Sequence, residues 1–318
     1  MKKSLLDFQS SAVYRDAVNR TIAQSIMLIS ADKYALTNFA EYLALTLMCE
    51  GESKPCMQCA ECHKILHHNH VDVQYYPKTN KTINSSEIAD LLDACFQAPY
   101  SADRKIFVLN DANSIDAGMQ NKLLKTLEEP PKDTYFILLV TEDNNILPTI
   151  KSRCRKWHLP QICAEEIEDE LKKLNIDPKT QLEVVEYSGG NCSLALRYAQ
   201  SDGFGTMVKF VQDLLTNFRR SSQMLDYASK MYKFNDDFEE FLTIFLKNCN
   251  DAVNFLTGQK VTNSLAQTIA RDFSVDAIVG MVSACRGFVE KRQRNCNFNT
   301  IVDSFLFMIL EVRHKWPI

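Results

Sequence analysis

Four cysteines lie within fourteen residues, in a hydrophilic stretch that also contains Gly51 and Pro55. Three of them have the spacing Cys-x2-Cys-x2-Cys, and the fourth precedes them by a gap of six residues. Zn²⁺ in structural sites takes four ligands in a tetrahedron, and Cys-x2-Cys turns bring two thiolates onto one metal. The sequence therefore predicts a structural zinc site with these ligands: Cys49, Cys56, Cys59 and Cys62.

Other ligands and other chemistries compete with this interpretation. Four sulfurs already complete a structural zinc site, so the cysteines are the favoured set over nearby histidines. An iron–sulfur cluster or a redox site is an alternative, but the stretch supplies no open coordination position or substrate site. Free or buried thiols without a metal are the simplest alternative. The rival histidines are His63, His67, His68 and His70.

The composition is that of an ordinary globular protein. The chain has 318 residues, of which 46% are hydrophobic and 24% are charged. This length suggests about two or three domains with real cores. The net charge of −4 argues against a general binder of polyanions, so any contact with nucleic acid must be a local patch.

Cysteine usage and the first residues indicate the compartment. An odd total of eleven cysteines, four of them clustered, fits metal binding in a reducing cytoplasm better than a disulfide framework. The chain has no apolar run of membrane length, and Asp7 interrupts its beginning too early for a signal peptide. We therefore expect a cytoplasmic protein without membrane contact.

A helix, a double proline and a buried strand follow one another in the middle of the chain. Leu123, Leu124 and Leu127 have the apolar spacing of a helix. Proline cannot continue a helix, so this one should end near Glu129. Residues 134–140 are β-branched, aromatic or apolar, and the run has the length of a strand. A helix that leads into a buried strand is half of a parallel α/β unit.

These segments, LLKTLEEPP, then FILLVT, then Ser152-Arg153-Cys154, resemble the clamp-loader branch of the AAA+ ATPases. The resemblance extends over nearly the whole chain and includes the cysteine insertion. It implies an α/β fold of the AAA+ P-loop type, with a parallel sheet, helices on both faces and a zinc insertion, followed by a helical lid and an all-α collar. The implied domains are residues 1–162 with the insertion at 49–63, the lid at 163–204 and the collar at 205–318.

The first buried strand, residues 25–30, should lead into the phosphate-binding loop G-x-x-x-x-G-K-[ST]. Backbone N–H groups of such a loop hold the phosphates, and its lysine neutralises them. Here both glycines are replaced, Leu36 stands in place of the lysine, and Lys33 lies elsewhere in the loop. ATP is therefore not expected to bind this chain. The positions of the degenerate loop are Ser30, Ala35 and Leu36, which are altered, and Thr37, which keeps the family's hydroxyl.

Two further elements of the family's ATPase site are altered. Active relatives have an Asp-Glu pair at the end of the next buried strand, for Mg²⁺ and for the attacking water, where this chain has Asn110 and Asp111. An amide cannot support the metal charge as a carboxylate does, and Asp111 is one methylene shorter than the usual base. In the lid, Ser193 matches an arginine that reaches the γ-phosphate, and Arg197 follows one turn later. Thr141 matches the family's sensor threonine, although a plain strand-end hydroxyl is the favoured interpretation.

The resemblance implies that Arg153, with Ser152 and Cys154 of its motif, acts in trans as an arginine finger. The chain would then hydrolyse no ATP itself and would complete a ring that loads the sliding clamp onto primed DNA. The implied partners are a γ/τ-like ATPase, a δ-like subunit and, through the complex, the clamp and primer–template DNA. The competing interpretation of Arg153 is a surface ion pair with Glu142 or Asp143.

Three other functions stay open. The chain could be the ATP-hydrolysing γ/τ subunit, an ATPase of unrelated purpose, or a zinc-dependent module that binds nucleic acid. Nucleotide binding by the isolated chain separates the first two from a non-hydrolysing subunit. DNA affinity of the isolated chain tests the third, which the net acidity and the lack of interleaved basic and aromatic residues disfavour.

Overall fold

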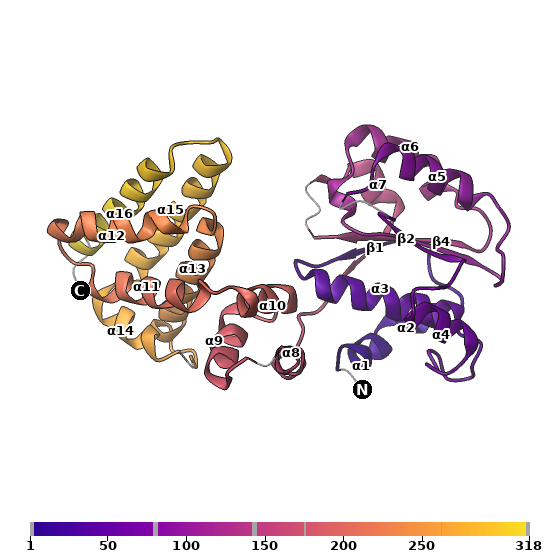
Figure 1. Ribbon diagram of the computed structural model, residues 1–318, viewed down its shortest axis with the longest axis horizontal. Coiled ribbons are helices and arrows are strands. Elements are labelled where there is room, and N and C mark those ends of the chain that lie inside the picture. Colours follow the sequence, from indigo (N-terminus) through magenta and orange to yellow (C-terminus); the bar gives the residue numbers. More distant parts are fainter. Residues whose placement is uncertain (1–2, 79–81, 142–144, 175, 262, 316–318) are drawn as a thin grey trace. The chain divides into compact units, whose positions relative to one another are not determined.

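The computed structural model describes residues 3–78, 82–141, 145–174, 176–261 and 263–315 (Figure 1). The chain divides into two compact units, residues 1–198 and 199–318. The first unit contains a β-sheet and its helices, and the second is helical. The finer division into three domains, with a separate lid at 163–204, stays a prediction.

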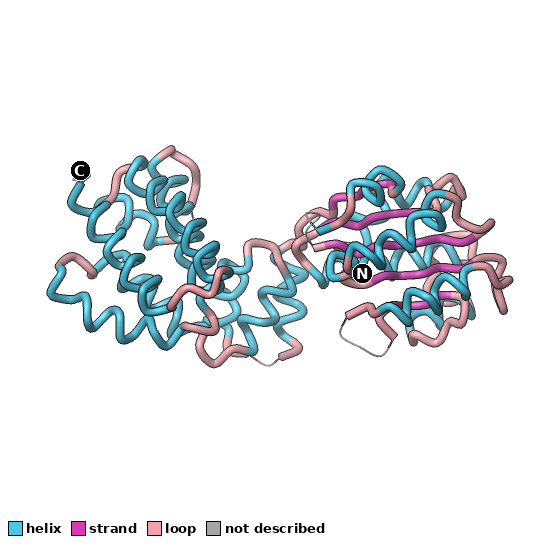
Figure 2. The backbone as a smooth tube through the Cα atoms, turned by 90° about the horizontal axis from the view of Figure 1, so that it is seen from above, coloured by secondary structure: helices cyan, strands magenta, loops and turns pink. Residues whose placement is uncertain are grey.

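The first unit is built on a parallel sheet of five strands in the order β2-β3-β4-β1-β5. Every residue of β1, β3 and β4 is buried, because helices cover both faces of these central strands. Figure 2 shows the strands side by side between the helices. β5, at one end of the sheet, is mostly exposed. The strands are β1 (Ser25–Ile29), β2 (Val73–Tyr76), β3 (Lys105–Leu109), β4 (Thr134–Val140) and β5 (Arg155–His158).

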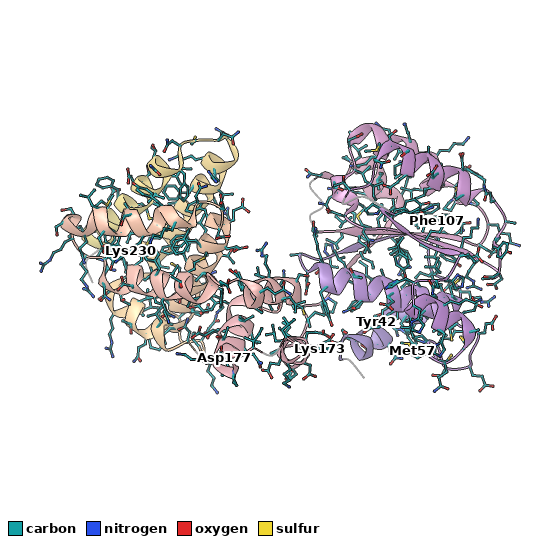
Figure 3. All side chains as sticks on the ribbon, viewed as in Figure 1. Tyr42, Met57, Phe107, Lys173, Asp177 and Lys230 are labelled. Atoms are coloured by element: carbon teal, nitrogen blue, oxygen red, sulfur yellow. The ribbon has the colours of Figure 1, made fainter. Side chains whose placement is uncertain are left out.

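Helices form a layer on each face of the sheet, and each layer closes one hydrophobic core (Figure 1). Side chains alternate along β4, so that Ile137 and Leu139 point into one core and Phe136 and Leu138 into the other. Phe107, labelled in Figure 3, stacks on Phe136 with ring centroids 5.4 Å apart. One layer contains α1 (Lys3–Ser10), α2 (Ala12–Val18), α3 (Lys33–Met48) and α4 (Ala60–Leu66), and the other contains α5 (Ser85–Cys95), α6 (Ala117–Glu128) and α7 (Pro148–Arg153).

Local signals explain where several helices begin and end. The sequence of residues 8–24 looks helical, and the structure has the end of α1 and all of α2 there, because Ser11 accepts a hydrogen bond from Tyr14 N and begins α2. Asp177 caps α9 in the same way, and Gly189, with φ of 57°, ends it. The helices after the sheet are α8 (Ala164–Lys172), α9 (Pro178–Ser188) and α10 (Cys192–Gln200).

The second unit is a helical bundle, as the sequence predicts. Aromatic side chains meet in its core, where the ring of Phe305 lies 5.6 Å from that of Phe241 and 5.0 Å from that of Phe245. No helix within the described ranges combines the length and the apolar character needed to span a membrane. The bundle contains α11 (Phe204–Asn217), α12 (Met224–Met231), α13 (Phe238–Leu256), α14 (Ser264–Asp272), α15 (Val275–Gln293) and α16 (Phe298–Lys315).

Candidate functional site

The four predicted cysteines come together beside the sheet. Cys49 follows the last residue of α3, Cys59 precedes α4 and Cys62 lies in the first turn of α4, while Cys56 belongs to the loop between these helices. Their four sulfur atoms all lie within 4.8 Å of one another. A tetrahedral zinc with Zn–S distances of about 2.3 Å needs sulfurs roughly 3.8 Å apart. The four sulfurs therefore fit a tetrahedral metal ion if they move slightly closer together.

Backbone N–H groups point at the sulfurs of this cluster. Gly51 N and Cys56 N each lie 3.3 Å from Cys49 Sγ, and Cys59 N lies 3.3 Å from Cys56 Sγ. Hydrogen bonds from the N–H groups of Gln58 and Cys59 lower the pKa of Cys56 to about 6. Amide donors stabilise a thiolate, which is the form of cysteine that binds metals.

Burial acts in the opposite direction on the two inner cysteines. Desolvation raises the pKa of Cys49 and of Cys62, which are 4% and 0% exposed. A cation between the four sulfurs would compensate this cost and allow all of them to ionise. The cluster therefore has backbone N–H donors that stabilise thiolates, and a bound cation would offset the cost of burying those thiolates.

The loop leaves no room at Gly51. A Cβ atom there would lie 2.8 Å from Cys56 Cβ and 3.0 Å from Cys56 Sγ. Glycine at this position allows the backbone to approach the cysteines closely. Met57, labelled in Figure 3, lies on the same loop with φ of 58°.

The nearby histidines make other contacts or lie outside the cysteine cluster. His70 is buried between Glu61, which pairs with its Nε2, and Asp72, whose backbone N–H donates to its Nδ1 at 3.1 Å. His63 and His67 stack on each other with ring centroids 6.1 Å apart. In the described ranges, the one group of side chains placed to share a metal ion consists of the four cysteines.

The segment in the position of the phosphate loop is largely helical. α3 begins at Lys33, so Leu36 N is hydrogen-bonded to Asp32 O at 3.1 Å, within the helix. Ala35 is fully buried and Leu36 is 3% exposed, which places both in the core. Thr37 Oγ1 donates back to Lys33 O at 3.0 Å. These backbone and side-chain groups are therefore not directed toward a ligand.

The altered pair Asn110 and Asp111 follows β3, and Thr141 follows β4. Asp111 adopts a left-handed conformation, with φ of 54°, and its Oδ2 lies 3.6 Å from Lys33 Nζ. The backbone N–H and the hydroxyl of Thr141 both donate to Asn113 Oδ1 at 3.1 Å. A pocket of about 870 Å³ lies here, lined in part by Lys33, Leu36, Thr37, Asn110, Asp111 and Thr141.

Ser193 contacts Asp32, which is not among the predicted site residues. It lies in the first turn of α10, and both its backbone N–H and its hydroxyl donate to Asp32 Oδ1, at 3.1 and 2.7 Å. Asp32 caps α3, and an aspartate directly before a helix is a readable capping signal. Its contact with a residue 161 positions later is not readable from the sequence.

Arg153 is the last residue of α7, and Glu128 of the LLKTLEEPP segment holds it. Its Nε and Nη2 both lie 2.9 Å from Glu128 Oε2, and its Nη1 donates to Thr149 O at 3.0 Å. Two of the five guanidinium N–H groups thus donate hydrogen bonds, and the other three donate none to the described residues. Glu142 and Asp143, the partners considered from the sequence, lie outside the described residues.

The neighbours of Arg153 in its motif have structural contacts. Ser152 is exposed, and its hydroxyl donates to Thr149 O at 3.0 Å. Cys154 is 6% exposed, and burial raises its pKa to about 12, so its thiol is a neutral part of the core. Arg153 is therefore the member of the motif that keeps N–H groups without a hydrogen bond to the described residues.

Comparison with known proteins agrees with the fold and the motifs. The family model of the DNA polymerase III delta subunit matches residues 8–163. DNA polymerase III subunit delta' of Haemophilus influenzae is 30% identical over 203 residues, which cover 62% of each chain. Subunit delta' of Bacillus subtilis is 28% identical over 163 residues, covering 51% of this chain and 49% of that protein. Subunit tau of Bacillus subtilis is 30% identical over 232 residues, covering 69% of this chain and 38% of that protein.

Each match thus covers between about two fifths and three fifths of the length of the curated relative. The match to the family model, residues 8–163, includes the α/β sheet, the cysteine cluster and the segment with Arg153. The sheet, the motifs and these relatives support a clamp-loader subunit of the AAA+ family.

Proposed function

We propose that the chain is a δ′-like subunit of the DNA polymerase III clamp loader, which hydrolyses no ATP and supplies Arg153 to a neighbouring ATPase subunit. The observation that carries this proposal is the start of α3 at Lys33. The amide of Leu36, which stands in place of the loop lysine, is hydrogen-bonded within the helix to Asp32 O, and the amide of Tyr34 donates to the Asp32 carboxylate.

The arrangement of Arg153 supports a role in trans. A guanidinium is planar and permanently charged, so it can spread the charge of a phosphate in a transition state. Glu128 and Thr149 fix its plane, and its side chain is 29% exposed. The chain's own ATP site is altered, so the group that Arg153 would serve belongs to the adjacent subunit.

The cysteine cluster supports one structural zinc ion per chain. All four sulfurs would be ligands, which leaves no open position for catalysis. The zinc would order the stretch between α3 and α4, which is too small to have a core of its own.

The proposed partners follow from the family. They are a γ/τ-like ATPase and a δ-like subunit and, through the complex, the sliding clamp and primer–template DNA. Co-purification with the γ/τ-like ATPase, followed by measurement of subunit stoichiometry, tests this part. High affinity of the isolated chain for DNA would instead favour a zinc-dependent module that binds nucleic acid.

The γ/τ subunit is the second candidate, because the tau relative matches this chain at an identity similar to that of the delta' relatives. We expect that calorimetric titration of the isolated chain with Mg-ATP gives no binding heat up to about millimolar concentration, since neither the loop nor the lysine is present. The γ/τ-like ATPase of the same organism, titrated in the same buffer, is the control that must show heat. A micromolar dissociation constant for this chain would reject the non-hydrolysing role and favour γ/τ.

A further inference from the structure

Asp32 lies between the first turns of two helices. Its Oδ1 accepts hydrogen bonds from Tyr34 N of α3 at 2.9 Å and from Ser193 N of α10 at 3.1 Å. Its Oδ2 accepts from Cys192 N of α10 at 2.7 Å. The hydroxyl of Ser193 adds a further bond to Oδ1 at 2.7 Å. The residue is 4% exposed, so one buried carboxylate is bound by donors from both helices.

The N-terminus of a helix carries a partial positive charge and free N–H groups, and it attracts anions. In a P-loop protein the N-terminus of the helix after the first strand meets the phosphates of the nucleotide. In this chain a side-chain carboxylate takes that place on α3. The same carboxylate also satisfies the first amide groups of α10, which belongs to the helical segment after the sheet.

Other contacts join the same two parts of the first unit. Tyr34 Oη donates to Glu170 Oε1 of α8 at 2.8 Å. Ser4 donates through its backbone N–H and its hydroxyl to the carboxylate of Glu166, at 2.9 and 2.8 Å. Glu166 is 5% exposed, so this contact is also shielded from water. Helices α8 and α10 are thus bound to the sheet region by groups of the chain itself.

We infer that Asp32 is a built-in anion that substitutes for a nucleotide phosphate and latches α8–α10 onto the sheet region. In this arrangement, the orientation of the two parts does not depend on nucleotide. The latch concerns this chain alone, so it does not depend on membership of a clamp-loader ring. Exchange of Asp32 for a residue without charge should open an anion site between the two helix N-termini.

The test compares full-length wild type with Asp32→Ala by amide hydrogen exchange and thermal unfolding. In the variant, the amides of Cys192 and Ser193 should exchange roughly tenfold faster or more, because each loses its acceptor. Tyr34 N should change less, because it also donates to Ser193 Oγ at 2.7 Å. Amides of the central strand β4 should not change. Inorganic phosphate should slow the amides of Cys192 and Ser193 again and raise the unfolding temperature, whereas sodium chloride of equal ionic strength should not.

Asp116→Ala is the matched control. Asp116 also caps a helix, α6, through one bond from Met119 N at 2.8 Å, but it is exposed and contacts one helix only. Its loss should lower the unfolding temperature without a specific response to phosphate. An equal phosphate response in both variants, or none in Asp32→Ala, would overturn the substitution of Asp32 for phosphate.

A second variant covers the case in which Asp32→Ala does not fold. Ser193→Ala removes one donor to Asp32 and one acceptor of Tyr34 N, and it keeps the bond from Tyr34 N to Asp32 that caps α3. It should accelerate exchange at Cys192 and at position 193, while Tyr34 N keeps one of its two acceptors. Unchanged exchange at Cys192 and position 193 would show that the carboxylate does not hold α10, and would reject the latch.

Discussion

Arg153→Ala should leave folding, zinc content and ring assembly intact and should lower DNA-stimulated ATP hydrolysis and clamp loading by the reconstituted complex. Arginine fingers contribute roughly 10³–10⁵ in rate in other NTPases. The ATP site that Arg153 serves should lose a factor of that order. The whole complex should lose less, because sites that Arg153 does not serve continue to hydrolyse ATP.

Conservative substitutions of Arg153 and of its partner Glu128 distinguish the effect of charge from the effect of side-chain geometry. Arg153→Lys should restore activity only in part, because an ammonium lacks the planar fork of a guanidinium. Glu128→Gln should weaken the contact that orients Nε and Nη2, and its loss of activity should be smaller than that of Arg153→Ala.

Arg155→Ala is the matched control for Arg153. Arg155 lies two residues further on, is exposed and pairs with Asp16 at 3.2 Å. Exposed ion pairs contribute under about 1 kcal/mol, so its loss should leave loading at the wild-type rate. If a correctly assembled ring with Arg153→Ala also loads clamps at that rate, the trans role is wrong.

Cys59→Ser should remove the metal and disorder the stretch between α3 and α4. Structural zinc contributes about 10–16 kcal/mol of apparent binding free energy in small peptides, and three sulfurs hold it far less well than four. Elemental analysis should fall from one zinc per chain to a small fraction. Limited proteolysis should then cut within residues 50–58, while the sheet stays folded because the core on its other face does not include this stretch.

Two further variants test the geometry of the metal site. Cys296→Ser changes an exposed thiol in the second unit and should keep one zinc per chain. Gly51→Ala keeps all four ligands but places a methyl group 2.8 Å from Cys56 Cβ, so it should weaken zinc retention under a chelator. Stoichiometric zinc in Cys59→Ser would mean that the ligand set is wrong, and His63 or His67 would then have to be tested.

The sheet could be predicted well because its strands carry their own signal. Thr134–Val140 is a continuous apolar run, and β4 has these bounds because both of its faces are buried. The cysteine cluster was also readable, since its ligands lie within fourteen residues and their spacing is a local property.

Contacts between distant segments could not be predicted in the same way. Glu128 and Arg153 belong to two motifs 25 positions apart, and only the packing of α6 beside α7 brings them together. Leu36 alone predicts the loss of the phosphate-binding loop. The start of α3 at Lys33 depends in addition on Asp32, which caps the helix. The contact of Asp32 with Ser193 depends on how α10 meets the sheet region.

The exposed, charged edge strand β5 affects whether two copies of the chain can associate through their sheets. β5 has one neighbouring strand, β1, in the described sheet, and its residues Arg155, Lys156 and His158 are exposed. An open edge strand is a template on which a strand of another chain can add, and such addition leads to fibrils and precipitates. A strand of only four residues with two permanent positive charges repels a second copy of itself. Joining of two copies of the chain through β5 is therefore disfavoured.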